Sequence, residues 1–202
     1  MATGLTAVAL PVDRYFVSAP REVLPLIAGT ARLDLLDLHD HKMEAVAENN
    51  LGGQAKLLQR TDFFIRLTTS AAGKWQLRLF PQNSGDTLMV VVRSVLASGE
   101  QSTISVYHKD WTASSLTIPT PRLGRFIKMD GSSISPFRMQ ELVTKLNEQP
   151  IKVDFTGDDF DIITFAISTD GLSIEDRKDV DDMLEPVRYK MTPLGSIIPY
   201  TD

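Results

Sequence analysis

The sequence contains no cysteine. This absence excludes thiol nucleophiles, iron–sulfur clusters and zinc sites built on cysteine. Long apolar runs are also lacking, because no stretch approaches the roughly 18 consecutive apolar residues of a membrane-spanning helix. The net charge of −5 at pH 7 lacks the basic excess that non-specific nucleic-acid binding requires. The sequence therefore predicts no nucleic-acid partner and no membrane span, and it leaves a lipid anchor open.

The remaining composition is that of an ordinary globular protein. Hydrophobic residues make up 43% of the 202 positions and charged residues 23%, which is within the usual range for a folded chain. A chain of this length can bury a core without metals or crosslinks. We expect a single domain over residues 1–202, with possible lobes at 20–118 and 134–202.

The first half predicts two helices followed by strands. Residues 1–19 favour an irregular lead-in, Arg21–Ile27 a short helix and Ala31–Asp40 a second helix. The hydrophobic periodicity then changes to two residues, most clearly at Lys74–Phe80, where apolar and polar side chains alternate. Other strands are expected at Phe63–Thr68, Thr87–Val95 and Thr103–His108. Short strands with tight connections indicate an antiparallel meander with one packed face and one wet face.

The second half predicts an alternation of helices and strands. Ser135-Pro136 begins a helix, and Ser173 to Asp176 resembles a capping box for another. Strands are expected at Ile151–Phe155, Asp161–Ser168, Val187–Met191 and Ser196–Pro199. This order lacks the regular alternation of a doubly wound fold. We therefore predict an α+β fold: an antiparallel β-meander with helices packed on one face.

Two clusters of polar residues raise the question of a metal. Asp37, His39, Asp40 and His41 are close in sequence, but on a helix the two histidines point in different directions. The run Gly157–Asp161 is acidic, yet it fails the register of a calcium-binding EF-hand loop and fits a hairpin turn better. Residues 154–185 carry eleven acidic and two basic residues. Such asymmetry can mark a cation site or a docking face, but a solvated helix face is the more common explanation. We expect no metal and no cofactor.

No catalytic signature is present. The run Gly131–Ser135 lacks the second glycine of a nucleophile elbow, and neither phosphate-loop motif occurs. A pair of carboxylates that meet only in the fold remains an alternative. The candidate binding residues are Tyr107, His108 and Trp111, because two aromatic rings and an imidazole follow one strand closely and can anchor a partner if they are exposed.

Several short segments together resemble an uncharacterised family of proteins of unknown function. They are Leu24–Ile27, Arg32–Asp37, Asn49–Gly53, Thr61–Leu67, Ser105–Tyr107 with Asp110-Trp111, and Arg188-Tyr189. The family comprises exported proteins of about 200 residues from anaerobic Gram-negative bacteria. The resemblance implies a periplasmic or cell-surface location, with the leader absent from the chain as given. It implies no activity and no catalytic residue.

Three functions follow as hypotheses. The first is a non-enzymatic exported module that binds a protein or polymer of the cell envelope through the open face of its sheet. The alternative is an envelope hydrolase acting on glycans, whose carboxylates converge in the fold. A third hypothesis, a carrier of a small ligand or lipid, requires a cavity of at least roughly 300 Å³ under the sheet.

Overall fold

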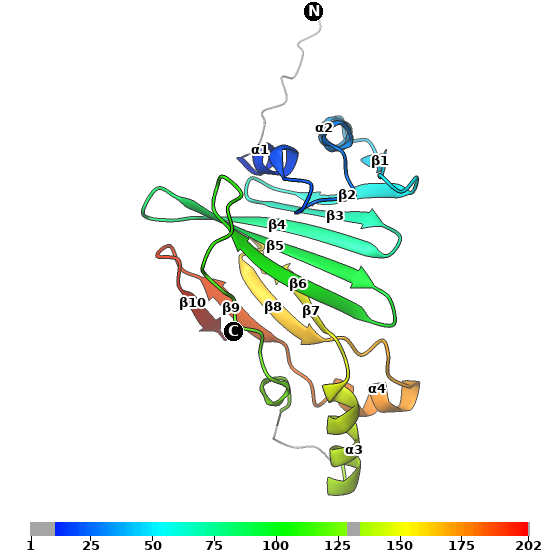
Figure 1. The fold of residues 1–202 in the computed structure, drawn as a ribbon. Helices are drawn as coiled ribbons and strands as arrows, with labels where there is room; N and C mark the ends of the chain where they lie inside the picture. The colour runs from blue at the N-terminus through cyan, green and yellow to red at the C-terminus, as the bar shows by residue number, and fades with distance from the viewer. Residues whose placement is uncertain (1–10, 129–133, 202) are drawn as a thin grey trace, which may run out of the picture.

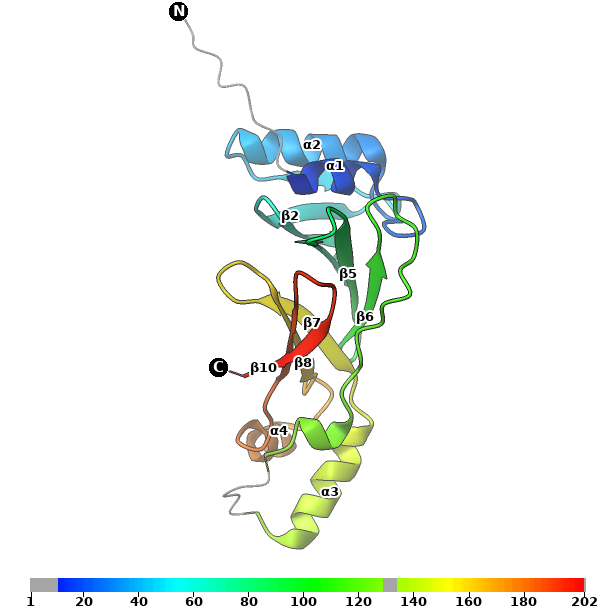
Figure 2. The ribbon, with the colours of Figure 1, turned by 90° about the vertical axis from the view of Figure 1, so that its left-hand side faces the viewer.

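The computed structural model describes residues 11–128 and 134–201, and it consists of helices above and below two stacked sheets (Figures 1 and 2). The α-helices are α1 (Pro11–Ser18), α2 (Gly29–Asp40), α3 (Pro136–Asn147) and α4 (Ile174–Asp181), and a 3₁₀ turn covers Leu123–Arg125. In the described residues, no helix combines the length and the hydropathy that crossing a bilayer requires.

The larger sheet is a six-stranded antiparallel meander in which each strand pairs with the next along the chain. Its strands are β1 (Val46–Glu48), β2 (Gln54–Arg60), β3 (Phe64–Ser70), β4 (Gly73–Pro81), β5 (Thr87–Leu96) and β6 (Glu100–Tyr107). The smaller, four-stranded sheet has the order β10-β9-β8-β7. Its strands are β7 (Ile151–Thr156), β8 (Ile162–Ile167), β9 (Val187–Met191) and β10 (Ile197–Tyr200). These observations confirm the predicted α+β fold with its antiparallel meander.

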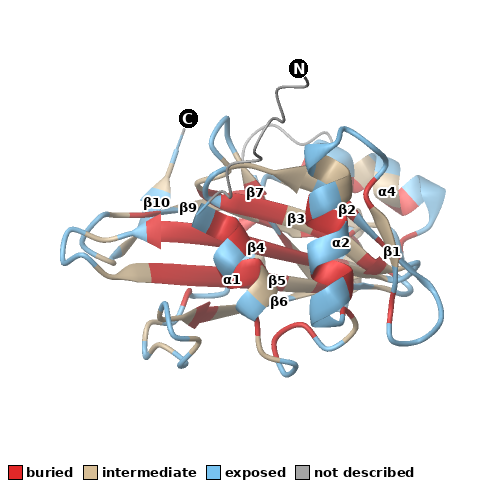
Figure 3. Ribbon diagram, turned by 90° about the horizontal axis from the view of Figure 1, so that it is seen from above, coloured by how far each residue is buried: buried red, intermediate tan, exposed pale blue. Residues whose placement is uncertain are grey.

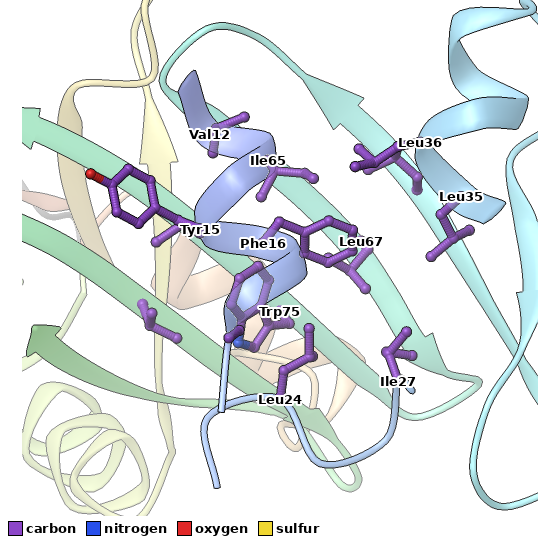
Figure 4. Packing of buried hydrophobic residues seen from close by; sticks show 14 of the residues in the cluster. Val12, Tyr15, Phe16, Leu24, Ile27, Leu35, Leu36, Ile65, Leu67 and Trp75 are labelled. Carbon is purple, nitrogen blue, oxygen red and sulfur yellow. The ribbon is translucent and has the colours of Figure 1, made fainter. Parts of the chain in front are cut away.

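Helices α1 and α2 cover one face of the larger sheet (Figure 3). Helix α1 contacts β3 and β4, whereas α2 contacts β1 and β2. The apolar side of α1 places Phe16 against Trp75 of β4, with ring centroids 5.9 Å apart. Leu35 of α2 and Leu67 of β3 belong to the same buried cluster (Figure 4). The prediction that helices pack on one face of the meander is confirmed.

The opposite face of the meander is covered over β4 and β5, and for these strands the prediction of a wet face is wrong. The smaller sheet packs against it, so that Phe80 and Val90 share a buried cluster with Phe155 and Phe165. Strands β4 and β5 are consequently buried on both faces over most of their length. Polar side chains at alternate positions indicated solvent, but Arg78, which was predicted to face water, is 8% exposed. A buried polar side chain can alternate with apolar ones when carbonyl groups accept its hydrogen bonds.

The N-terminal region also differs from the prediction. Residues 11–18 form helix α1, where an irregular lead-in was expected, and residues 21–27 form turns in place of the predicted helix. The buried guanidinium of Arg32 explains the second difference. It donates to the carbonyls of Ala19, Leu24 and Ile27 at 2.5, 3.1 and 2.9 Å, so it satisfies carbonyls that a helix would otherwise bond internally. Pro25 also disfavours a regular helix there.

Both helix starts predicted in the second half are confirmed. Ser135 Oγ accepts a hydrogen bond from the amide of Arg138 at 3.3 Å, ahead of Pro136 at the first turn of α3. Ser173 Oγ likewise accepts from the amide of Asp176 at 3.1 Å at the start of α4. These caps satisfy amides that lack partners within the helix. The acidic turn after β7 is a hairpin as predicted, with Gly157 at a φ of 84°.

Candidate binding groove beside strand β6

Strand β6 is an edge strand of the larger sheet. In an antiparallel sheet, the amide and carbonyl of alternate residues point toward the same neighbouring strand. The carbonyl of Val106 accepts from the amide of Ser114 at 2.9 Å, and the amide of Glu100 donates to Ser168 Oγ at 3.0 Å. Both partners lie outside the sheet. The even-numbered residues of β6 therefore direct their backbone groups away from β5.

Two residues between these ends leave their outward backbone groups unpaired. Ser102 and Ile104 have the same parity as Glu100 and Val106, so their amides and carbonyls also point away from β5. No described residue forms a hydrogen bond with these four groups. The edge of β6 is therefore free over a short stretch and closed at both ends.

A groove of about 550 Å³ lies along this free edge. One wall is β6, another is the chain segment 113–120, and the floor comes from β7 and β8 of the smaller sheet. Figure 2 shows the segment after β6 descending beside the two sheets. The apolar lining consists of Ile104, Val106, Ala113, Leu116, Ile118, Ile151, Val153 and Phe165, and the hydroxyl-bearing lining consists of Ser102, Thr103, Ser105, Tyr107, Ser114, Thr117 and Thr120.

Hydrogen bonds tie the walls of the groove to one another. The amide of Val153 in β7 donates to Ser102 Oγ at 2.9 Å, and Ser102 Oγ is also 2.7 Å from Ser94 Oγ. Ser114 anchors the outer segment to β6 through the bond to Val106 described above, and a bridge joins Tyr107 to Ala113. The groove is thus built from regular backbone on two sides and a tethered segment on the third.

The structure places the three predicted binding residues in different surroundings. The rings of Tyr107 and Trp111 contact each other edge to face with centroids 5.5 Å apart, and both pack against the cluster under α1. The indole Nε1 of Trp111 donates to Ser18 Oγ at 3.2 Å. Tyr107 lines one end of the groove. Trp111 therefore anchors the turn after β6 to α1, and of the aromatic pair only Tyr107 borders the groove.

His108 borders a second, smaller hollow of about 330 Å³ on the other side of the same segment. Its Nδ1 lies 3.2 Å from Asp86 Oδ2. The amide of Thr87 and the imidazole of His108 lower the pKa of Asp86. Ser114 and Leu116 line both hollows and so separate His108 from the groove. The role of these predicted residues in binding stays a prediction.

The histidine-rich end of α2 has ordinary structural partners. His41 Nδ1 lies 2.8 Å from the carbonyl of Asp37, and His39 Nδ1 lies 3.5 Å from an Nη1 donor of Arg60. Arg60 also pairs with Asp13, at 2.5 Å. Over residues 11–128 and 134–201, no three histidine or acidic residues are grouped as a metal site requires.

Sequence reasoning missed the groove because its defining feature is topological. The alternation at Thr103–His108 predicts a strand, but it does not reveal that this strand is the last of its sheet. The floor residues Val153 and Phe165 are about 50 to 60 residues away in sequence and meet β6 only through the packing of the two sheets. The abundance of serine and threonine in 102–106 and 112–120 is the local signal that could have indicated an exposed, neutral surface.

Residues 5–192 match a family described as "Protein of unknown function (DUF3256)". No curated protein matches the chain. A solved structure described as a domain of an uncharacterized protein from Porphyromonas gingivalis W83 is similar, with 23% identity, a TM-score of 0.76, and coverage of 96% of this chain and 100% of that one. At this identity the likeness shows a shared fold alone.

Proposed function

Because this chain belongs to the family described as "Protein of unknown function (DUF3256)", which assigns no activity, we propose its function from the site: a non-enzymatic binding module that takes an uncharged, partly apolar ligand into the groove beside β6. The site proposed here is the edge of the sheet, since the face expected to be open is covered by the smaller sheet. Following the resemblance seen in the sequence, we also propose the periplasm or cell surface as its location.

The composition of the groove carries this proposal. None of its fifteen lining residues is charged, although charged residues make up 23% of the chain. Moving a charged group into such surroundings costs desolvation energy that no lining side chain offsets. The volume of about 550 Å³ is within the range of ligand sites, which combine apolar walls with a few polar groups. The lining therefore selects for neutral ligands.

The same composition gives no support to the glycan-hydrolase alternative at this site. Glycoside cleavage uses two carboxyl groups flanking the bond to be broken, and the groove lining contains none. General acid–base work by histidine has no basis there either, because His108 borders the other hollow. Binding without chemistry is the function that the groove supports best.

Binding of the uncharged solvatochromic dye Nile red tests the proposal. The wild-type chain should bind the dye with a blue-shifted emission. Thr117→Asp adds a carboxylate to an exposed residue that lines the groove, and it should weaken dye binding about tenfold. Ser115→Asp is the matched control, because Ser115 is exposed on the same segment and does not line the groove. Equal affinities of the two variants would overturn the proposal.

A further inference from the structure

We propose that the ligand of the groove is an extended, uncharged peptide segment of another protein, which binds as an additional strand on β6. This inference rests on the proposed function and specifies its ligand. A sheet edge with free amides and carbonyls is a template for strand addition, in which main-chain hydrogen bonds provide affinity and side-chain pockets provide specificity. The free groups of Ser102 and Ile104 form such a template inside the groove.

The other sheet edges in the described part of the chain are protected. Strand β1 is only three residues long, and β10 carries Pro199, which cannot donate a ladder hydrogen bond. On β7, two outward groups are bonded to side chains from the larger sheet, since Ser102 Oγ accepts from the amide of Val153 and Arg66 donates to the carbonyl of Phe155 at 3.1 Å. Proteins generally protect such edges against unwanted pairing. An edge left free beside an apolar groove is therefore suited to a specific partner.

The ends of the free stretch limit the length of the added strand. The carbonyl of Val106 is already bonded to Ser114, and the amide of Glu100 is bonded to Ser168. Pairing is thus confined to the residues between them, and a segment of about five residues fits this span. Two residues of β6 offer one donor and one acceptor each.

The groove also defines the side chains of the partner. Successive residues of a strand point to opposite faces. Residues on one face of the added strand would contact the apolar floor at Val153 and Phe165, while those on the other face would meet solvent. The preferred segment alternates apolar residues such as valine with small polar residues such as threonine, and it carries no charge.

The probe for the test is the blocked peptide acetyl-Val-Thr-Val-Thr-Val-amide, titrated into the full chain labelled with nitrogen-15. We expect the amide proton signals of Ser102 and Ile104 to shift downfield with increasing peptide saturation, because these amides form hydrogen bonds to the peptide. We also expect the peptide to displace Nile red. Two N-methylated peptides extend the test, one methylated on its valines and one on its threonines. In the added strand, only the amides of alternate residues point toward β6. Methylation of those residues should therefore lower the affinity at least tenfold, and the peptide methylated on the other residues should still bind.

The variant Ile104→Pro removes the outward amide itself. Proline is tolerated at an edge position whose amide does not pair within the sheet, so the ladder to β5 should persist. Peptide affinity should fall at least tenfold, with folding checked from the dispersion of the other amide signals. If this variant does not fold, the N-methylated peptides provide the same test with the wild-type chain.

The outcomes separate this inference from the proposed function. Dye binding without peptide binding, or equal effects of the two methylation patterns, would overturn strand addition and leave the groove as a site for another neutral ligand. Loss of both dye and peptide binding would overturn both. Self-association of the chain in sedimentation velocity that Ile104→Pro abolishes would assign the edge to a second copy, and this too would overturn the inference.

Discussion

The two faces of the six-stranded sheet are covered in different ways. On the face under α1 and α2, the contacts are almost entirely apolar, and Trp75 and Leu77 are buried in the same cluster as Phe16. On the face under the smaller sheet, apolar residues share the interface with buried polar ones, among them Gln76 and Arg78. Helices present side chains to the sheet, whereas a second sheet also presents strand edges and hairpin turns with free carbonyls.

Arginines on the second face donate to carbonyls of the smaller sheet and also to carbonyls of the larger sheet itself. Arg66 donates to the carbonyl of Phe155 at 3.1 Å. Arg78 donates to the carbonyls of Phe63, Leu79 and Phe160 at 3.1, 2.9 and 3.1 Å. Burial lowers the pKa of Arg78. The first face is therefore stabilised by the burial of apolar surface, and the second partly by hydrogen bonds to backbone carbonyls. Substitutions on the two faces should consequently lower the free energy of unfolding for different reasons.

Trp75→Ala should have the largest effect. The indole is 1% exposed, contacts Phe16 and donates from Nε1 to the carbonyl of Val23 at 3.2 Å. Removing it leaves a large cavity in an apolar cluster, which should cost about 3–5 kcal/mol of unfolding free energy. Urea denaturation followed by circular dichroism measures this cost. Phe137→Ala serves as the control, because Phe137 is 82% exposed and should change stability by less than about 0.5 kcal/mol. A loss below 1 kcal/mol for Trp75→Ala would contradict the apolar description of the first face.

Arg78→Met should have the next largest effect. Methionine fills much of the same volume but leaves the carbonyls of Leu79 and Phe160 without this donor, while the carbonyl of Phe63 still accepts from the amide of Leu79 at 2.8 Å. We expect a loss of about 2–4 kcal/mol. The measurement is again urea denaturation. A variant as stable as the wild type would show that the second face is held by apolar contact alone, as the first face is. Crystallography of the variant could then reveal whether water replaces the guanidinium.

The ion pairs between α3 and α4 predict a dependence on pH. The ammonium of Lys145, the Ser173 cap and the guanidinium of Arg138 lower the pKa of Asp176 to about 2. Because the folded pKa lies below the ordinary value near 3.8, the stabilisation is present above about pH 4 and is lost as the pH falls toward 2. Asp176→Asn should therefore melt at a lower temperature than the wild type at pH 7, and the difference should shrink between pH 4 and 2.5.

Thermal melts of both proteins over this range measure the effect. A difference in melting temperature that stays constant with pH would contradict a contribution from the charge of Asp176. Glu175→Gln is the matched control, since Glu175 is an exposed acidic neighbour at the start of the same helix. Its melting temperature should follow that of the wild type across the range.

The sequence predicted the fold class and most of the strands because the period-two pattern and the turn residues are local signals. The caps of α3 and α4 could also be predicted, since Ser135 and Ser173 act on amides three residues away. The packing of the smaller sheet on the second face could not be predicted, because a buried arginine such as Arg78 and a solvated arginine produce the same alternating pattern in a strand. The groove requires knowing that β6 is an edge and that Val153 lies beneath it, which only the packing of the sheets determines.

Lys74→Met should have the smallest effect on stability. It tests how far along β4 the smaller sheet covers the second face. Lys74 alternates with Gln76 and Arg78 along β4, but its side chain is 32% exposed and its ammonium pairs with Glu100 at 2.9 Å. A pair this accessible contributes less than about 1 kcal/mol and weakens with salt. Denaturation at 0.05 and 0.5 M sodium chloride should show a small loss that disappears at the higher salt concentration. If Lys74→Met were as costly as Arg78→Met and insensitive to salt, the cover of the second sheet would extend to the end of β4.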